Sequence, residues 1–181
     1  MDEARVSFFD TSSRLIGWCS GSGETRPDAG AWPFPYVGED YGQLGGLFWK
    51  HLERHFETYR PTLVGFETPL MVPHDTLDKV RKLYGVIFLL ETFCDQRDVP
   101  MFERGNADLK RELTGNPKAD KDAMIEAATL CGIRLPDTKS EGRGDAADAF
   151  AGWLIGIREE RPDLSRRWDR VVFSRGRGGL L

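Results

Sequence analysis

The stretch RVSFFDTSSRLIGWCS, residues 5–20, decides the fold class of this chain. Both of its ends, RVSFFD (5–10) and RLIGWCS (14–20), are short apolar runs with many β-formers, and the TSS between them is a turn signal. The pattern predicts a β-hairpin. The segments that follow alternate between helical and strand patterns. A hairpin before such an alternation predicts one α/β domain, with a mixed central β-sheet flanked by α-helices.

The remaining elements are predicted from apolar spacing and from turn residues. Residues 21–46 are rich in Gly and Pro, so they are expected to form a loop, with a third strand around AWPF (31–34) as the alternative. Pro61 ends the first helix, and Gly132 caps the fourth. The predicted helices cover 44–59, 76–98, 108–113, 119–132 and 144 to about 157, the predicted strands cover 62–67 and 99–104, and VVFS (171–174) forms a last strand or packs as a tail.

Composition limits the class of protein. The chain has 181 residues, enough for one domain with a full core. No apolar run approaches the ~20 residues that span a bilayer, and no basic segment followed by an apolar one opens the chain, so we expect a cytoplasmic protein with no membrane partner. Cys19, Cys94 and Cys131 form no CxxC pair, which favours three buried free thiols over a zinc site or disulfides.

The formal net charge of −4 argues mildly against a nucleic-acid binder, because such proteins usually carry a basic excess. The objection is weak if acidic residues bind metal, since the ligands lower the total charge and the bound cations restore positive charge locally. Positive charge is also concentrated near the end of the chain, where residues 158–177 hold seven arginines.

Four carboxylates lie where an apolar strand or helix meets a turn. Asp10 ends the first strand, Glu67 ends the strand TLVGFE, and Asp145 and Asp148 open the most apolar helix, which begins with GDAADAFAGWL (144–154). Singly, Asp10 could be a turn former, and Asp145 a helix cap, with Asp148 gaining from the helix dipole. Glu67 has the weakest such explanation, because Glu favours neither turns nor strands. Together, the four acids are better explained as a metal-ligand set.

Such a set suits hard divalent cations. Mg²⁺ and Mn²⁺ prefer oxygen ligands, and two such ions about 4 Å apart can stabilise the attacking and leaving oxygens in phosphodiester hydrolysis. Metal between the acids would also explain why Asp145 and Asp148, three apart on one helix face, tolerate each other. The predicted chemistry is therefore metal-dependent hydrolysis.

The chain resembles the RuvC-type Holliday junction resolvases of the ribonuclease H-like superfamily, and most of all the versions carried by phages and prophages. Four segments match the family's motifs in order, together with VRKLYG (80–85). They are FFDTSSRLIGW around Asp10, LVGFETP around Glu67, the lysine-bearing LKRELTGNPKADKDAM, and the closing GDAADAFAGW. Each motif alone is weak, but the four in this order and spacing are specific, and they span most of residues 5–157.

The resemblance implies a ribonuclease H-like fold and a homodimer that binds branched DNA and cuts it with two Mg²⁺ per site, with Mn²⁺ as a substitute. Asp10, Glu67, Asp145 and Asp148 would be the metal ligands, with Asp10 bridging both ions. Lys121 would lie by the scissile phosphate and Lys110 would contact the DNA backbone. Arg111, Lys118 and Ser12 are further expected DNA contacts. Residues 1–160 would form the nuclease domain, and 161–181 an Arg-rich tail that belongs to the domain or is flexible.

The chain departs from the family's pattern in two turns. Thr11-Ser12 stands where Pro-Gly is usual after the first Asp. Leu70, followed by Met71, stands where family members often carry an aromatic wedge that opens the junction centre. Aliphatic side chains can also unstack bases.

The substrate therefore stays open between four-way junctions and a broader class of flaps and forks. A non-catalytic branched-DNA-binding protein of the same fold is a further alternative, which retention of all four acids disfavours. An ATP-using phosphotransferase of the related actin-like fold is excluded, because the chain has no room for a second domain with a phosphate loop.

Other polar and aromatic residues have less specific interpretations. His51 and His55 are four apart on a helix, but without a third ligand they are expected to form a solvated or packed face. Trp18, Phe34 and Tyr36 are expected in the core or in a dimer contact, and LLETF (89–93) in the dimer face implied by the resemblance. The Arg-rich C-terminus fits a DNA-binding tail or a solubilising terminus equally well.

Overall fold

The middle of the sheet is β1 (Val6–Asp10), the first half of the predicted hairpin. The computed structural model describes residues 4–12, 14–38, 40–71, 73–164 and 168. Within them the sheet has the strand order β3-β2-β1-β4-β5. β1 pairs antiparallel with β2 (Leu15–Gly21), which pairs antiparallel with β3 (Asp28–Pro33). On the other side, β4 (Leu63–Glu67) and β5 (Met101–Arg104) run parallel to β1, so the predicted mixed sheet is confirmed.

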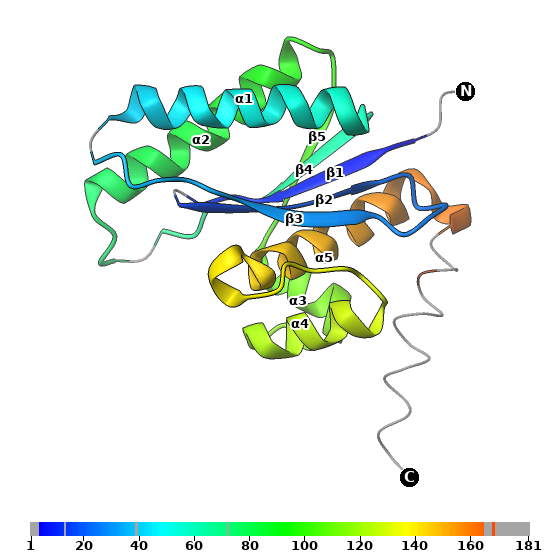
Figure 1. Ribbon diagram of the computed structural model, residues 1–181. Coiled ribbons are helices and arrows are strands. Elements are labelled where there is room, and N and C mark those ends of the chain that lie inside the picture. Colours follow the sequence, from blue (N-terminus) through cyan, green and yellow to red (C-terminus); the bar gives the residue numbers. More distant parts are fainter. Residues whose placement is uncertain (1–3, 13, 39, 72, 165–167, 169–181) are drawn as a thin grey trace.

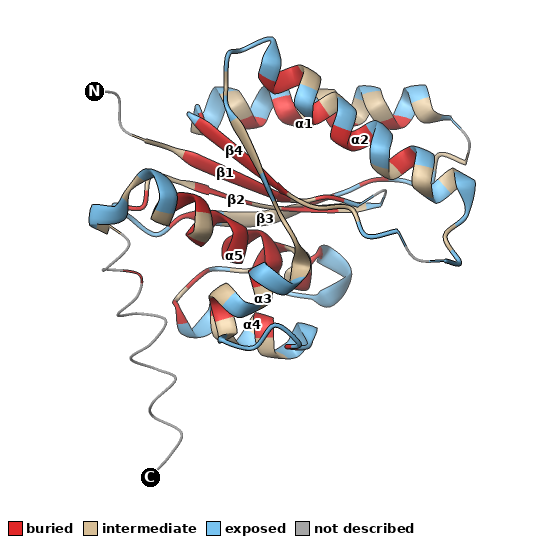
Figure 2. Cartoon of the chain, turned by 180° about the vertical axis from the view of Figure 1, so that it is seen from behind, coloured by how far each residue is buried: buried red, intermediate tan, exposed pale blue. Residues whose placement is uncertain are grey.

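Helices cover both faces of the sheet (Figure 1). One face carries α1 (Tyr41–Tyr59) and α2 (Leu77–Asp95), and the other carries α5 (Arg143–Glu160), with α3 (Asn106–Thr114) and α4 (Lys121–Leu130) packed on it. A short 3₁₀ helix, η1 (Lys139–Glu141), precedes α5. Successive side chains of a strand point to opposite faces, so Phe8 joins the core under α5 and Phe9 the core under α1 and α2. Figure 2 shows this burial on both faces of the sheet.

α5 is the central helix of its layer. Its first four turns are buried on almost every side, because it lies between the sheet and the pair α3 and α4. Trp153 and Phe150 of α5 also pack against Trp168, which is buried and donates a hydrogen bond to the carbonyl of Gly23 at 3.0 Å. Trp168 thus contributes to the core, while VVFS and most of the Arg-rich segment lie outside the described residues.

Element boundaries differ from the predicted ones for local reasons. α1 begins three residues before the predicted Leu44, because the Asp40 carboxylate accepts a hydrogen bond from the amide of Gln43 and caps the helix. The alternative third strand is confirmed as β3, although it starts before AWPF. α4 ends at Leu130 with Cys131 as its C-cap, and Gly132, at φ +81°, follows the cap, where its left-handed backbone stops the helix as predicted.

The histidine and cysteine predictions are confirmed in the core. His55 is buried, and its Nε2 lies 2.7 Å from the Ser20 hydroxyl and 3.1 Å from that of Ser7. His51 stacks on Trp32 with ring centroids 5.0 Å apart. All three cysteines are buried free thiols. Among the described residues, no helix combines the length and apolar character needed to cross a bilayer.

Candidate metal centre

Strand pairing brings Asp10 and Glu67 to one edge of the sheet. β1 and β4 are parallel neighbours with Phe9 paired to Phe66, so the next residues, Asp10 and Glu67, follow side by side. Asp10 is also paired with Gly17 across the β1–β2 ladder. The sequence prediction that both acids end adjacent core strands is therefore confirmed.

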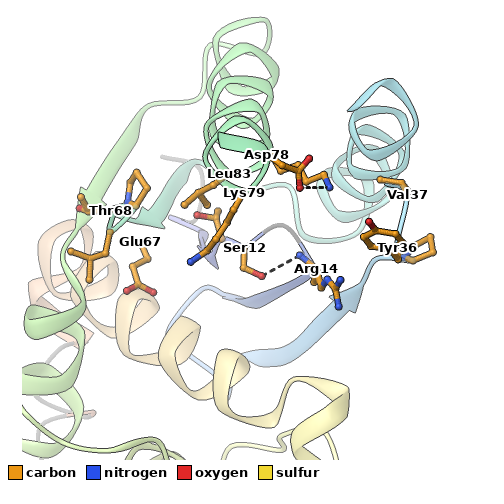
Figure 3. A pocket seen from close by; sticks show the side chains of 14 residues that line it. Ser12, Arg14, Tyr36, Val37, Glu67, Thr68, Asp78, Lys79 and Leu83 are labelled. Atoms are coloured by element: carbon orange, nitrogen blue, oxygen red, sulfur yellow. Dashed lines mark hydrogen bonds and ion pairs between the residues drawn. The ribbon is translucent and has the colours of Figure 1, made fainter. Parts of the chain in front are cut away.

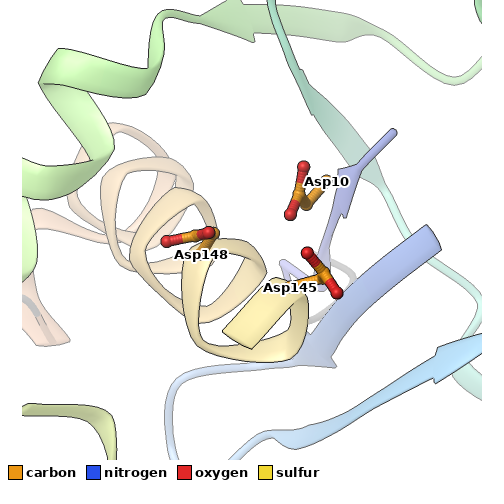
Figure 4. Close-up of side chains that lie close together, drawn as sticks. All are labelled: Asp10, Asp145 and Asp148. Atoms are coloured by element: carbon orange, nitrogen blue, oxygen red, sulfur yellow. The ribbon is translucent and has the colours of Figure 1, made fainter. Parts of the chain in front are cut away.

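Gly17 lets α5 approach this edge. A Cβ at Gly17 would lie 2.2 Å from the carbonyl oxygen of Asp145, closer than real Cβ contacts allow. The start of α5 therefore lies directly against the residue that faces Asp10. As a result, Asp10, Asp145 and Asp148 each offer a carboxylate oxygen, and these oxygens lie within 4.8 Å of one another (Figure 4).

Neither aspartate of α5 is a helix cap. The N-cap is Gly142, at φ +86°, so the explanation of Asp145 as a capping residue is wrong. Asp145 lies in the first turn, where the helix dipole favours a carboxylate. Asp148 lies beyond that turn and is only 6% exposed, and its Oδ1 has no hydrogen-bond partner among the described residues. A buried carboxylate oxygen without a partner is costly, and a bound cation would remove that cost.

Glu67 completes the acidic edge from β4. It lies outside the group of three oxygens, but its charge and its hydrogen bond act on Asp10. The Asn106 side-chain amide donates a hydrogen bond of 2.8 Å to Glu67 Oε1. Asn106 is the first residue of α3, just after β5, so a third parallel strand sends a polar side chain to the same edge. This residue was missed, although the rule that joined Asp10 to Glu67 could have found it.

Burial and mutual repulsion raise the pKa values of Asp10 and Asp148. Burial first, and then the charge and hydrogen bond of Glu67, raise the pKa of Asp10 well above its ordinary value, and Asp148 and Asp145 add to the effect. Burial also raises the pKa of Asp148 to about 6, against the opposing charge of Lys121. The cluster therefore carries more negative charge than the nearby cations balance, and a bound divalent cation would supply the missing positive charge.

Lys121 supplies part of that positive charge. Its Nζ lies 2.5 Å from Asp145 Oδ1 and 3.7 Å from Asp148 Oδ2. Burial alone would lower the pKa of Lys121, but the hydrogen bond to Asp145 and the three aspartate charges raise it. Gly144 makes room for this side chain, because a Cβ there would lie 2.2 Å from Lys121 Cε. The predicted catalytic lysine thus lies against two of the predicted metal ligands.

The oxygen-only donor set fits a hard divalent ion such as Mg²⁺ or Mn²⁺. Three carboxylates from β1 and α5 converge, and Glu67 stands next to them with its orientation fixed by Asn106. The geometry can hold cations, whereas the number of ions and their identity stay predictions.

The residues predicted to contact DNA are distributed around the cluster. Lys110 is near enough for its charge to lower the pKa of Asp148. Arg111 forms an ion pair with Asp108 at 2.8 Å. Lys118 is exposed in the segment between α3 and α4, where its backbone amide donates a hydrogen bond of 3.0 Å to Asn116 Oδ1. Their DNA contacts stay predictions.

The turns after β1 and β4 also carry predicted DNA contacts. The Ser12 hydroxyl stabilises the β1–β2 turn, accepting from the amide of Leu15 at 3.1 Å and donating to its carbonyl at 2.5 Å. Leu70 and Met71, at the predicted wedge position, are 64% and 58% exposed. Both are thus accessible to a macromolecular ligand.

Two predictions about apolar residues change. Tyr36 is 76% exposed, so the core alternative is wrong for it and a dimer contact stays a prediction, whereas Phe34 is buried and Trp18 is half-buried. Within LLETF, Leu90 and Phe93 are fully buried in the core shared by α1, α2 and the sheet. Because they are buried inside one chain, they cannot form a dimer face. The helical pattern in the sequence identified an apolar face, but it did not show which part of the protein covers that face.

The fold is that of solved Holliday junction resolvases. Thermus thermophilus RuvC in complex with a Holliday junction substrate matches with a TM-score of 0.70 at 16% identity, over 89% of this chain and 97% of that one. A second T. thermophilus RuvC structure matches at 0.64 and 15% identity, over 84% and 96%. The yeast mitochondrial Holliday junction resolvase Ydc2 matches at 0.57 and 11% identity, over 91% and 85%.

These matches show a RuvC-like, ribonuclease H-like fold, as the sequence predicted. Identities of this size show the fold and leave the activity to be argued from the site. No family model matches the sequence, and comparison with curated proteins also gives no match.

Proposed function

We propose that the protein is a metal-dependent endonuclease that cuts branched DNA, with four-way junctions as its main substrate. The observation that carries the proposal is the convergence of Asp10, Asp145 and Asp148, with a buried Asp148 oxygen that lacks a partner. The shared fold with resolvases, one of them solved with a junction, supports the choice of substrate. The reaction class is phosphodiester hydrolysis.

In this proposal the four acids hold two Mg²⁺, with Mn²⁺ as a substitute. When bound, such ions supply a hydroxide nucleophile near neutral pH and neutralise charge on the phosphate. Asp10 lies on the central strand, next to both Glu67 and α5, so it would share in holding the ions. Lys121, already beside Asp145, would offset negative charge on the scissile phosphate. Asn106 keeps the Glu67 carboxylate oriented.

DNA would be held on both sides of the acidic edge. Lys110, Arg111 and Lys118 would pair with backbone phosphates. Ser12 lies in the turn that follows Asp10, so it would contact the strand near the cut. Exposed Leu70 and Met71 would act as an aliphatic wedge at the junction centre.

We further propose a homodimer, because one face of α2 is apolar and exposed. Leu77, Tyr84 and Phe88 are 74%, 46% and 67% exposed, and their spacing of seven and four places them on one side of the helix. Gly85 lies beside them, and a Cβ there would meet nothing within 4 Å. A glycine in an exposed helix is otherwise unfavourable, and here it would allow a second α2 to approach closely. A two-fold axis would then place two metal centres on one four-way substrate.

A broader flap and fork nuclease is the alternative, because an aliphatic wedge is less selective for the open centre of a junction than an aromatic one. A non-catalytic DNA-binding role is disfavoured by the converged acids. Origin in a phage or prophage, and a DNA-binding role for the Arg-rich C-terminus, stay predictions from the sequence.

The test compares cleavage of a synthetic four-way junction, a flap, a fork and a plain duplex in Mg²⁺ and in Mn²⁺. We expect the junction to be cut fastest and the duplex not at all. Asp10→Asn should abolish cutting while junction binding persists, whereas Asp137→Asn, in an exposed loop, should cut like the unchanged protein. Equal cutting by Asp10→Asn would refute the metal-centre assignment, and equal cutting of flap and junction would favour the broader alternative.

A further inference from the structure

A pocket of about 550 Å³ opens beside the metal centre. Its walls come from the β1–β2 turn, from residues 35–37 after β3, from the segment that follows β4, and from the first turns of α2. Figure 3 shows Glu67 and Thr68 on one side, Tyr36 and Val37 on the other, and Ser12 between them. We call this cavity the Tyr36 pocket. Because Glu67 belongs both to the pocket and to the acidic edge, an occupant of the pocket would lie next to a phosphate bound at that edge.

Tyr36 forms an aromatic wall of the pocket. Its ring is largely exposed, yet the Arg14 guanidinium carbon lies 5.2 Å from the ring centroid and Lys82 Nζ lies 5.6 Å from it. Such cation–π contacts hold an exposed ring in place. A fixed ring with most of its surface open to solvent can stack with another flat group at little entropic cost.

The two cations beside the Tyr36 ring, Arg14 and Lys82, differ in their ion pairing. Lys82 is buried and bonds Asp78 at 2.8 Å, and the Tyr41 hydroxyl also donates to Asp78, so this group stiffens the wall. Arg14, in contrast, forms no ion pair with the described residues. Its guanidinium therefore remains available for an anionic group at the pocket mouth.

Thr11 adds an unpartnered polar atom. It is 9% exposed and lines the pocket, and its Oγ1 lacks a hydrogen-bond partner among the described residues. A buried hydroxyl in this state is unfavourable unless a ligand bonds to it. The pocket thus offers a stacking surface, a cation and a hydrogen-bonding hydroxyl, which are the groups that bind a nucleotide.

We propose that the Tyr36 pocket takes one unstacked nucleobase of the strand being cut, stacked on Tyr36 and bonded at its edge to Thr11. Arg14 pairs with the phosphate of the same or the adjacent nucleotide. This inference rests on the proposed nuclease function and adds a base-binding subsite to it. The subsite would make cutting depend on a base near the scissile bond, in addition to the effect of the neighbouring wedge, whose Leu70 lines one end of the pocket.

The test uses four-way junctions that each carry one abasic site at a different position near the cut. With the unchanged protein, one position within a few nucleotides of the cut should lower kcat/KM by roughly five- to hundred-fold, the range that base–aromatic stacking gives. Tyr36→Ala should lower cutting of the intact junction by a similar factor and should be insensitive to the abasic site at that position. Tyr36→Phe should restore both the rate and the sensitivity, because it keeps the ring.

Arg14 is tested by binding, which does not require cutting. Arg14→Ala should weaken junction binding and reduce the slope of log K against log salt by about one, the value for one lost phosphate contact. Arg54→Ala, on the exposed side of α1, is the matched control and should leave the slope unchanged.

The outcomes separate the two proposals. If the unchanged protein cuts no junction, the nuclease function fails and the base-binding subsite fails with it. If it cuts but Tyr36→Ala matches it, or if the losses from Tyr36→Ala and from the abasic site multiply, the subsite alone is overturned. Thermal melting of Tyr36→Ala should match that of the unchanged protein, since the ring is mostly exposed.

Discussion

Asn106 reaches Glu67 from the start of α3 and fixes one oxygen of that carboxylate by a 2.8 Å hydrogen bond. Groups that orient a metal ligand typically contribute ten- to hundred-fold in affinity. We therefore expect Asn106→Ala to weaken Mn²⁺ binding by about ten-fold, as measured by isothermal titration calorimetry. Asn116→Ala, in the exposed segment between α3 and α4, should bind the metal like the unchanged protein. Unaltered affinity in Asn106→Ala would show that Glu67 needs no such support.

Gly144 makes room for the lysine of the metal centre. A Cβ there would overlap the Lys121 side chain, which is flexible and can move away. We expect Gly144→Ala to displace Lys121 from Asp145, lowering the cutting rate on the order of ten- to hundred-fold while the melting temperature changes little. Cleavage assays and thermal melting on one preparation measure both effects.

Two other glycines provide controls for this substitution. At Gly17 the added Cβ would strike the backbone of Asp145, which cannot move without α5, so Gly17→Ala should cost stability of about 1–3 kcal/mol. At Gly46 of α1 the Cβ meets nothing within 4 Å, and the alanine variant should be slightly stabilised. If Gly144→Ala keeps full activity, Lys121 does not act from the position it has here.

His55 links α1 to β1 through Ser7 and to β2 through Ser20. Burial lowers the pKa of His55 to about 3, whereas an unfolded histidine has a pKa of about 6.5. Between these values the unfolded chain binds a proton that the folded chain does not, so stability falls as the pH falls from 6.5 towards 3. From this group alone we expect a loss of about 2 kcal/mol between pH 6.5 and pH 4.5, measured by urea unfolding.

His55→Leu should remove that part of the acid sensitivity. The variant should be less stable at pH 7, because Ser7 and Ser20 lose a buried partner, yet its stability should change less between pH 6.5 and pH 4.5. His74→Leu, in the exposed segment before α2, should keep the full pH dependence. The same pH dependence in His55→Leu and in the unchanged protein would rule out this histidine as its source.

The strands and helices could be predicted where the chain carries a local signal. The hairpin β1–β2 has a turn between two β-rich runs, and α5 has an apolar run after a glycine-rich turn. Asp10 and Glu67 could be joined in advance because parallel neighbours end at the same edge of a sheet. Their convergence with the start of α5 was inferred from the shared position of all four acids at element ends, which the family resemblance supported, and the structure adds the reason, which is the bare backbone of Gly17.

Other contacts have no local signal. Ser7, Ser20 and His55 meet only through strand register and helix packing, so nothing in their spacing predicts a network. Tyr36 follows two prolines, and the pattern did not show that the segment would hold the ring above a pocket. Apolar periodicity in α2 predicted a helix, but it did not show that Leu90 and Phe93 would face the core and Phe88 the solvent.

The candidate metal centre forms only when the sheet and the helical layer of α3, α4 and α5 are assembled. Asp10 and Glu67 come from the sheet, Asp145 and Asp148 from α5, Lys121 from α4 and Asn106 from α3. No single unit of consecutive elements contains all of them, so metal affinity should report how well the sheet and this helical layer are packed together. By the same logic a cation that binds only the folded chain stabilises it.

The dimer that we propose would form through the exposed face of α2 that contains Leu77, Tyr84 and Phe88. If this face joins two copies, a charge at its centre must be buried without a partner on dimerisation, so Phe88→Glu should be monomeric at concentrations where the unchanged protein is dimeric. Gly85→Gln should act in the same direction by blocking close approach of two helices, without disturbing the monomer, since the space around Gly85 is open. Sedimentation velocity over a range of concentrations measures both effects.

Leu130→Glu, at an exposed apolar position on α4, is the control and should leave the dimer intact. If the unchanged protein is monomeric, or if Phe88→Glu dimerises as well as the unchanged protein, this face is not the interface. Each metal centre would then act on its own.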